Sequence, residues 1–308
     1  LKYIAKEGGY KFDKESLEFV VNNYPIEEIK LSNTNLYHIQ DINMNKLNSK
    51  VYKDILNKKF IALQSEKGTG KTYNLLNALF KENPKPPKSV LFISSRRTFG
   101  IKLSADLKKY GFELYSNISE YYIYNKNIIC QIDSLTRLQN NKFDVVIIDE
   151  CESLARYMGS SHFTKNPKSN LIISELEDRV ESCDKLIIMD ADLSDRCMNY
   201  YTQILDGNLN RSNVAVIRNN FTPYQNYTMN YMRYNHWLNL LLEKIKENKK
   251  IAIPMASNNK AKDLLELLKA KFPKKECLLI HKETKDEEKL QQLLRVNENW
   301  VNYDVVIY

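Results

Sequence analysis

The chain has 308 residues, of which 43% are hydrophobic, and it carries a formal net charge of +8. This length predicts about two domains, and the hydrophobic content suffices for sizeable cores, which excludes a wholly disordered protein. No run of about 18 apolar residues occurs, so we expect a soluble protein without a membrane-spanning helix, and the basic excess suits a polyanionic partner such as nucleic acid.

Residues 1–49 are expected to form a peripheral extension, with one short helix at 15–24 and a polar, loop-like stretch at 31–45. From residue 50 to residue 222, apolar strands alternate with helical patterns, which predicts a parallel sheet covered by helices on both faces. The predicted strands are 60–63, 89–95, 127–133, 143–149 and 185–192, and the clearest helices are 98–110 and 169–182.

A linker is predicted at residues 218–226, which contain a proline and several asparagines. A second, smaller α/β domain is expected at residues 223–308, with helices at 236–248, 260–272 and 287–296. Its predicted strands are 249–255, 276–281 and 303–308. Because the first residue is Leu1 and the last predicted strand ends the chain, we expect this sequence to be a piece of a longer protein whose second sheet is incomplete.

Residues 65–72, with the sequence SEKGTGKT, form the most informative motif of the chain. They lie between a predicted strand and a helix-like segment, the order in which a glycine-rich loop cradles phosphate. The Lys71 amine is placed to reach the β- and γ-phosphates of ATP, and the Thr72 hydroxyl to bind Mg²⁺. Ser65 stands where the usual pattern has glycine. The residues expected to bind nucleotide are Glu66, Lys67, Gly68, Thr69, Gly70, Lys71 and Thr72.

Two acids, Asp149 and Glu150, follow the apolar run at 145–148. The carboxyl ends of parallel strands meet at the edge of the sheet where ligands bind, so both acids are expected to lie near the phosphate loop. Asp149 is expected to hold Mg²⁺ with Thr72, and Glu150 to orient the attacking water. Lys71, Asp149 and Glu150 form the expected catalytic set. Taken alone, the two acids could equally be a solvated strand end.

Polar turns after other predicted strands are candidates for contact with the DNA backbone, because hydroxyl and guanidinium groups suit phosphate oxygens. The turn at residues 94–100 could instead be a solvated helix start with a capping serine, the one at 131–138 a polar loop before the acidic strand, and the one at 254–264 an ordinary polar turn. The candidates are Ser95, Arg96, Arg97, Thr98, Ser134, Arg137, Ser257 and Lys260. Asp190 and Asp192 end the fifth predicted strand and could couple nucleotide state to the neighbouring domain, or be a plain acidic strand end.

Five motifs in this order, EKGTGKT, LFISSRRTF, QIDSLTRL, FDVVIIDECESL and IIMDADLS, resemble those of superfamily 2 helicases of the herpesvirus origin-binding protein type. Relatives occur in other large DNA viruses, including asfarvirus-like ones, where the helicase can be joined to a primase. The resemblance covers residues 60–194, with fainter support to residue 308.

The resemblance implies an α/β fold with two RecA-like lobes, of which the second is truncated here, and an ATP- and Mg²⁺-dependent motor that moves along DNA. It implies that motif I lies at Gly68, Gly70, Lys71 and Thr72, motif II at Asp149 and Glu150, motif Ia at residues 95–98, motif III at residues 190–192 and motif IV at residues 254–260. The arginine fingers of such motors would follow residue 308, so we expect these residues alone to bind ATP but to hydrolyse it poorly. The resemblance also implies action in the host cytoplasm or nucleus with other replication proteins, and it leaves oligomerisation open.

Two other functions remain open from the residues alone. A P-loop phosphotransferase would need an acceptor pocket and an arginine-bearing lid. A nucleotide-gated DNA-binding module would need no turnover. The five cysteines have no paired spacing, which favours neither disulfides nor a zinc site and fits a reducing compartment.

Overall fold

The computed structural model describes residues 11–12, 31–94, 97–124, 126–139, 142–223, 230–281, 283–285, 288–289, 291–292 and 296–308. Two compact units divide the chain, and their described residues are 31–223 in the larger unit and 11–12 with 230–308 in the smaller. The helix expected at residues 15–24 lies outside the described residues. No helix among the described residues is long and apolar enough to cross a membrane.

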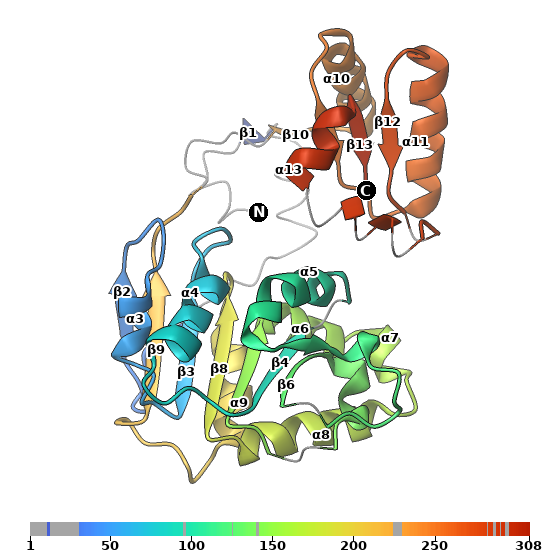
Figure 1. Ribbon diagram of the computed structural model, residues 1–308. Coiled ribbons are helices and arrows are strands. Elements are labelled where there is room, and N and C mark those ends of the chain that lie inside the picture. The colour runs from blue at the N-terminus through green and yellow to red at the C-terminus, as the bar shows by residue number, and fades with distance from the viewer. Residues whose placement is uncertain are drawn as a thin grey trace. The chain divides into compact units, whose positions relative to one another are not determined.

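The larger unit is built on an eight-stranded sheet in the order β2-β9-β3-β8-β7-β4-β6-β5 (Figure 1). Every neighbouring pair in this sheet is parallel. The strands are β2 (Ile39–Ile42), β3 (Phe60–Gln64), β4 (Val90–Ser94), β5 (Glu113–Leu114), β6 (Asn127–Gln131), β7 (Val145–Asp149), β8 (Lys185–Asp190) and β9 (Val214–Asn219).

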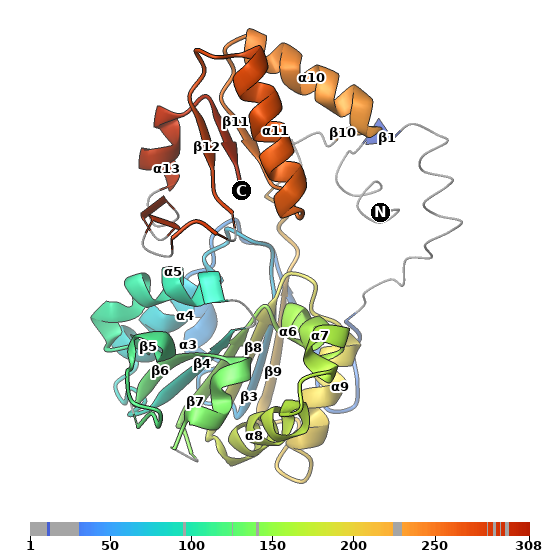
Figure 2. The same ribbon diagram turned by 90° about the vertical axis from the view of Figure 1, so that its right-hand side faces the viewer.

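Helices cover both faces of this sheet, as the alternating pattern predicts. Figure 2 shows α3, α4 and α5 on one face and α6, α7, α8 and α9 on the other. Strands buried on both faces need continuous apolar runs, and every residue of β4 and β7 is buried. The helices are α3 (Ser49–Lys53), α4 (Lys71–Asn77), α5 (Arg97–Leu107), α6 (Cys151–Met158), α7 (Ser161–Thr164), α8 (Ser169–Ser182) and α9 (Asp195–Ile204).

Short helical segments complete the larger unit. A π-helical segment at Ala78–Glu82 continues α4, and 3₁₀ turns occupy Lys108–Tyr110, Tyr115–Asn117 and Ile132–Arg137.

Three strands of the larger unit, β2, β5 and β9, depart from the sequence-based expectation, and the two residues of β5 were not predicted as a strand. Residues 39–42 were expected in a loop, but they form β2 and pair with β9. β9 was not predicted, and it includes Arg218 and Asn219, which were assigned to the linker. β2 is only partly buried and β5 has two residues, so neither has the long apolar run that marks a central strand. β9 does have an apolar run, at residues 214–217, but its polar end was interpreted as the start of the linker.

The smaller unit contains a three-stranded parallel sheet in the order β11-β13-β12. Helices α10 and α11 pack on one face, and α13 lies on the other (Figure 2). The elements are β10 (Asn230–Tyr231), α10 (Tyr234–Lys246), β11 (Ile251–Ile253), α11 (Asn258–Lys271), β12 (Cys277–Leu279), α13 (Val296–Asn299), a 3₁₀ turn (Trp300–Asn302) and β13 (Val305–Ile307). β10 pairs in parallel with β1 (Lys11–Phe12). The α/β expectation for this region is therefore confirmed.

Candidate nucleotide-binding site

The glycine-rich loop connects β3, which ends at Gln64, to α4, which begins at Lys71. Gly68 and Gly70 both have φ of +81°, a left-handed conformation that glycine adopts without steric cost. A Cβ atom at Gly70 would lie 2.8 Å from the Asn74 side-chain nitrogen. The loop therefore has its tightest turns where the sequence supplies glycine.

The Lys71 side chain folds back over this loop. Its Nζ donates hydrogen bonds to the carbonyl oxygens of Ser65 at 2.5 Å and Glu66 at 3.1 Å. Burial lowers the pKa of the amine, and the neighbouring carboxylates of Asp149 and Asp190 oppose that shift. Lys71 thus places a partly buried positive charge beside two acids, and an anionic ligand bound there would offset the cost of burying that charge.

Thr72 and Asp149 join the loop to the far strand β7. The Thr72 hydroxyl donates a hydrogen bond of 2.7 Å to Asp149 Oδ2, and Asp149 Oδ1 accepts one of 3.0 Å from the Glu150 N–H. Burial raises the pKa of Asp149, against the opposing effect of the Thr72 hydrogen bond. The two residues are separated by 77 positions in the sequence, yet the fold brings their oxygens together as the motifs predicted.

Glu150 has an unusual backbone. Its φ is 55°, and in the described part of the chain only one other non-glycine residue, Asn248, has a positive φ. Glu150 occupies the N-cap position of α6, and its carboxylate lies 3.4 Å from the Lys67 amine. A left-handed conformation is costly for a side chain of this size, and such strain is typical of functional sites.

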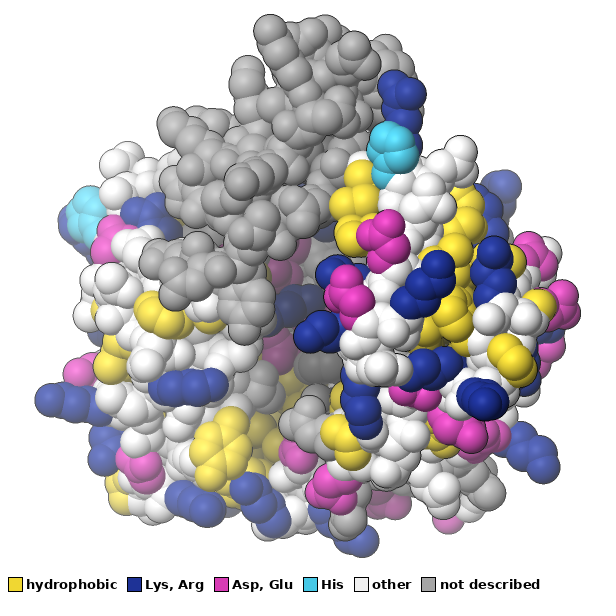
Figure 3. Space-filling view, turned by 90° about the horizontal axis from the view of Figure 1, so that it is seen from above, with side chains coloured by type: hydrophobic (Ala, Val, Ile, Leu, Met, Phe, Trp, Pro, Cys, Tyr) yellow, Lys and Arg dark blue, Asp and Glu magenta, His cyan; other side chains and the backbone are white. Residues whose placement is uncertain are grey.

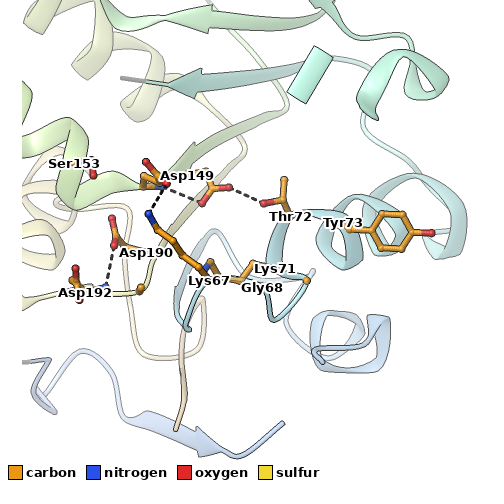
Figure 4. Close-up of a pocket in the computed structure, with 12 residues that line it drawn as sticks. Lys67, Gly68, Lys71, Thr72, Tyr73, Asp149, Ser153, Asp190 and Asp192 are labelled. Carbon is orange, nitrogen blue, oxygen red and sulfur yellow. Dashed lines mark hydrogen bonds and ion pairs between the residues drawn. The ribbon is translucent and has the colours of Figure 1, made fainter. Parts of the chain in front are cut away.

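These side chains converge on a pocket of about 480 Å³, shown in Figure 4. The residues that line it are Lys67, Gly68, Gly70, Lys71, Thr72, Tyr73, Asp149, Glu150, Ser153, Asp190, Ala191 and Asp192. Two lysines and the start of α4 supply positive charge and N–H donors for phosphate oxygens. The Thr72 hydroxyl and the Asp149 carboxylate are hard oxygen ligands of the kind that Mg²⁺ prefers. The residues present therefore fit a magnesium-bound nucleotide.

The end of β8 is tied to this pocket through Asp190. Its carboxylate accepts hydrogen bonds from the N–H groups of Glu152 at 2.8 Å and Asp192 at 3.0 Å, and burial raises its pKa. The Asp190 carbonyl oxygen also accepts a hydrogen bond of 3.0 Å from the Ser65 N–H. Asp192 lines the same pocket but is exposed. Asp190 therefore bonds both the phosphate loop, through Ser65, and the start of α6, through Glu152.

Three residues beyond the predicted set complete this network. The buried Glu152 carboxylate accepts hydrogen bonds from the Ser194 N–H at 3.0 Å and the Ser194 hydroxyl at 2.6 Å, and it forms an ion pair with Arg196. Burial alone would raise the pKa of Glu152, but these partners hold it below its ordinary value. The acid two residues after Glu150 was a weak sequence signal, and nothing in the sequence linked it to Ser194 or Arg196, more than 40 residues away.

Arg137, a candidate for DNA contact, is used inside the protein. Its guanidinium donates hydrogen bonds to the carbonyl oxygens of four residues at 2.7–3.2 Å, namely Tyr115, Ile118, Glu120 and Tyr121. These contacts fix the loop that precedes β6. They account for the arginine without a nucleic-acid partner.

The remaining DNA candidates follow the ends of strands in the two units. Ser257 is the N-cap of α11 and accepts a hydrogen bond of 3.4 Å from the Lys260 N–H, whereas the Lys260 side chain is exposed. Ser134 is half-buried in the 3₁₀ turn after β6. Ser95 and Arg96 lie outside the described residues, and of Arg97 and Thr98 only the backbone, in the first turn of α5, is described.

The visible face in Figure 3 shows lysine and arginine side chains interspersed with aspartate and glutamate.

Comparisons with known proteins agree with the resemblance drawn from the motifs. A replication origin-binding protein of human herpesvirus 6A is 30% identical over 251 residues, which are 78% of this chain and 30% of that protein. A protein of African swine fever virus, provisionally named as part of a helicase/primase complex, is 26% identical over 80% of this chain and 22% of its own length. The chain therefore spans less than a third of the length of these relatives.

Solved structures with this fold include S. cerevisiae Dbp5 bound to RNA and ADP BeF3, with a TM-score of 0.56 and 14% identity. The match covers 99% of this chain and 75% of Dbp5, and it shows that the fold is that of RecA-like helicase domains. The family described as origin of replication binding protein matches residues 53–229. This chain belongs to that family.

Proposed function

We propose that this chain is the ATP-dependent helicase or translocase segment of a viral DNA replication protein. The observation that carries the proposal is the convergence of Lys71, Thr72 and Asp149 on one pocket beside Glu150. Membership of the origin-binding protein family adds DNA as the partner. The herpesvirus 6A relative is named for its binding to a replication origin, and the African swine fever virus relative for a helicase/primase complex.

Each pocket residue has a role in this proposal. Thr72 and Asp149 would hold Mg²⁺, which when bound neutralises charge on the β- and γ-phosphates. Lys71 would leave the carbonyls of Ser65 and Glu66 to stabilise the charge that develops on the γ-phosphate. Glu150 would orient the attacking water, and its contact with Lys67 keeps its carboxylate at the pocket edge.

DNA contact is proposed at residues 95–98, which follow β4 and include the first two residues of α5. Removing one phosphate-contacting arginine weakens binding across all sequences and lowers the salt slope by about one. The variant Arg97→Ala is therefore expected to weaken single-stranded DNA binding with a smaller salt dependence. An unchanged salt titration would remove residue 97 from the proposed track.

The test is ATP hydrolysis by the full-length protein with and without single-stranded DNA. DNA is expected to stimulate hydrolysis, and Glu150→Gln is expected to lose turnover while retaining nucleotide binding. Phosphate transfer to a small molecule with no response to DNA would replace the motor with a phosphotransferase. Nucleotide-dependent DNA affinity without any turnover would replace it with a gated binding module.

A further inference from the structure

A buried chain of side-chain hydrogen bonds runs from the end of β9 into the phosphate loop. Asn219 Nδ2 lies 3.1 Å from Ser65 Oγ, and Ser65 Oγ lies 2.9 Å from Thr69 Oγ1. Thr69 Oγ1 in turn lies 2.8 Å from the Glu66 carbonyl oxygen. The three side-chain residues are 5%, 1% and 0% exposed, so solvent competes little with these bonds.

The direction of donation along this chain follows from its two ends. The Thr69 hydroxyl donates to a carbonyl, so its oxygen must accept from the Ser65 hydroxyl, and Ser65 Oγ then accepts from Asn219. The Asn219 amide cannot be reversed, because its Oδ1 accepts the Met44 N–H at 2.9 Å and its Nδ2 donates to the Met44 carbonyl at 2.8 Å. All donors therefore point toward the phosphate loop.

The loop end of this chain meets the nucleotide machinery. The Glu66 carbonyl that accepts from Thr69 also accepts from the Lys71 amine at 3.1 Å, and the Ser65 carbonyl accepts from the same amine at 2.5 Å. Thr69 is further fixed by its carbonyl, which accepts the Leu47 N–H at 2.8 Å. The position of both Lys71 acceptors thus depends on residues that the Asn219 chain holds.

The other end of the chain lies where the backbone leaves the sheet. Asn219 is the last residue of β9, and its Oδ1 also accepts the Phe221 N–H at 3.3 Å. The chain of bonds therefore links the phosphate loop to the segment that continues toward the smaller unit.

We propose that Asn219 is a positioning residue for the phosphate loop, which it holds through the Ser65 hydroxyl in the shape that accepts a nucleoside triphosphate. This inference rests on the proposed function of the loop. It also explains why serine stands where the usual motif has glycine, since glycine would break the chain at its centre. Restoring the glycine is therefore expected to weaken nucleotide binding.

The test compares Asn219→Ala, Ser65→Ala and the double variant in the full-length protein, by equilibrium binding of a fluorescent ATP analogue and by ATPase kinetics. Asn219→Ala removes the bond to Ser65 and also those to Met44 and Phe221, and Ser65→Ala removes the bonds to Asn219 and Thr69. One buried hydrogen bond contributes about 1 kcal/mol, so each single variant is expected to weaken ATP binding by at least about fivefold. Because both changes break the same chain, the double variant is expected to match the single variants rather than to multiply their effects. KM is expected to rise while kcat holds, as for lost ground-state binding.

Asn220→Ala is the matched control. Its side chain donates to Asp41 at 2.9 Å, also between β9 and β2, but no bond to the phosphate loop is described for it. This variant is expected to bind ATP as the parent does. Ser65→Ala removes the hydroxyl and keeps the Cβ atom, so it tests the chain from its centre if Asn219→Ala does not fold. Ser65→Gly restores the usual residue of the motif and should weaken ATP binding as well.

The outcomes separate this inference from the proposed function. Folded Asn219 and Ser65 variants with parental ATP affinity, or multiplicative losses in the double variant, would overturn the positioning role. If Lys71→Ala abolished turnover in the same assays, the proposed nucleotide site would remain supported even though Asn219 did not position the loop. If Lys71→Ala changed nothing, the proposed function itself would fail.

Discussion

The phosphate loop after β3 and the turn after β6 carry the same kind of sequence signal, polar residues at the end of a predicted strand, but the structure uses them differently. Lys71 and Thr72 face a pocket lined by two further strand ends. Arg137 instead turns to carbonyls of the neighbouring loop. A polar strand end therefore indicates a ligand site when residues from several strands converge on it, and otherwise it often satisfies the backbone nearby.

The comparison is tested most strongly at the phosphate loop. Lys71→Ala is expected to lower DNA-stimulated ATP hydrolysis by the full-length protein at least about 100-fold, as for loss of one preorganised charge donor. Hydrolysis is measured by phosphate release at saturating ATP. Lys85→Ala, which removes an exposed lysine from the same region, is the control and should retain the parental rate. A Lys71→Ala protein with normal turnover would show that the convergence in Figure 4 is not a catalytic site.

The turn after β6 is the next test. Arg137→Ala is expected to lower the free energy of unfolding by about 2–3 kcal/mol, because it leaves several carbonyl oxygens without their charged donor. Denaturant titration measures the loss, with the exposed Arg211→Ala as the control. The salt dependence of DNA binding should not change. A stable variant with a salt slope lowered by about one would instead return Arg137 to the DNA track.

The start of α11, in the smaller unit, also tests whether a polar residue after a strand binds a ligand or satisfies the nearby backbone, and the expected effect there is smaller. Ser257→Ala removes the side-chain cap and is expected to cost about 1 kcal/mol of stability. Hydrogen exchange at the first amides of α11 should report it, with DNA affinity unchanged. Reduced DNA affinity with unaltered hydrogen exchange would mean that the Ser257 hydroxyl binds a DNA phosphate rather than capping α11.

The smallest expected effect concerns the cost of burying Asp149. Because burial raises its pKa above the ordinary aspartate value, its contribution to stability is complete below that ordinary value and is lost as the pH rises through the raised pKa. Asp149→Asn removes the titrating carboxyl, but its single amide oxygen can accept from Thr72 or from the Glu150 N–H and not from both. In magnesium-free buffer, the Tm of the parent relative to that of this variant should therefore fall as the pH rises from acid to pH 7, and each kcal/mol corresponds to roughly 2–4 °C. A Tm difference that is the same at both pH values would contradict the cost of burying the charge.

The parts of the fold that the sequence predicted well are those with a local physical signal. β3, β4, β7 and β8 are contiguous apolar runs, because both of their faces are buried, and α8 begins and ends where expected. β2 was missed because it is only partly buried, and β9 was missed because its apolar run at residues 214–217 ends in polar residues that were assigned to the linker. β9 pairs with β2 on one side and with β3 on the other, and no local sequence pattern shows such pairing.

The candidate site divides in the same way. Lys71, Thr72 and Asp149 were found because each belongs to a compact motif with a known phosphate chemistry. Ser65 was noticed only as a departure from the pattern, and Asn219 was assigned to a linker. Their hydrogen bond joins residues 154 positions apart, and contacts of that kind arise from strand order rather than from neighbouring sequence.

The strand order also has a consequence for synthesis. β9 is the last strand of the larger unit to leave the ribosome, yet it lies between β2 and β3. Until residue 219 has emerged, β3 keeps an open edge and β2 has no place to pair. During synthesis, the nascent chain would therefore expose an unpaired strand edge that is prone to aggregation until β9 emerges. The nascent chain would most need a chaperone before that point.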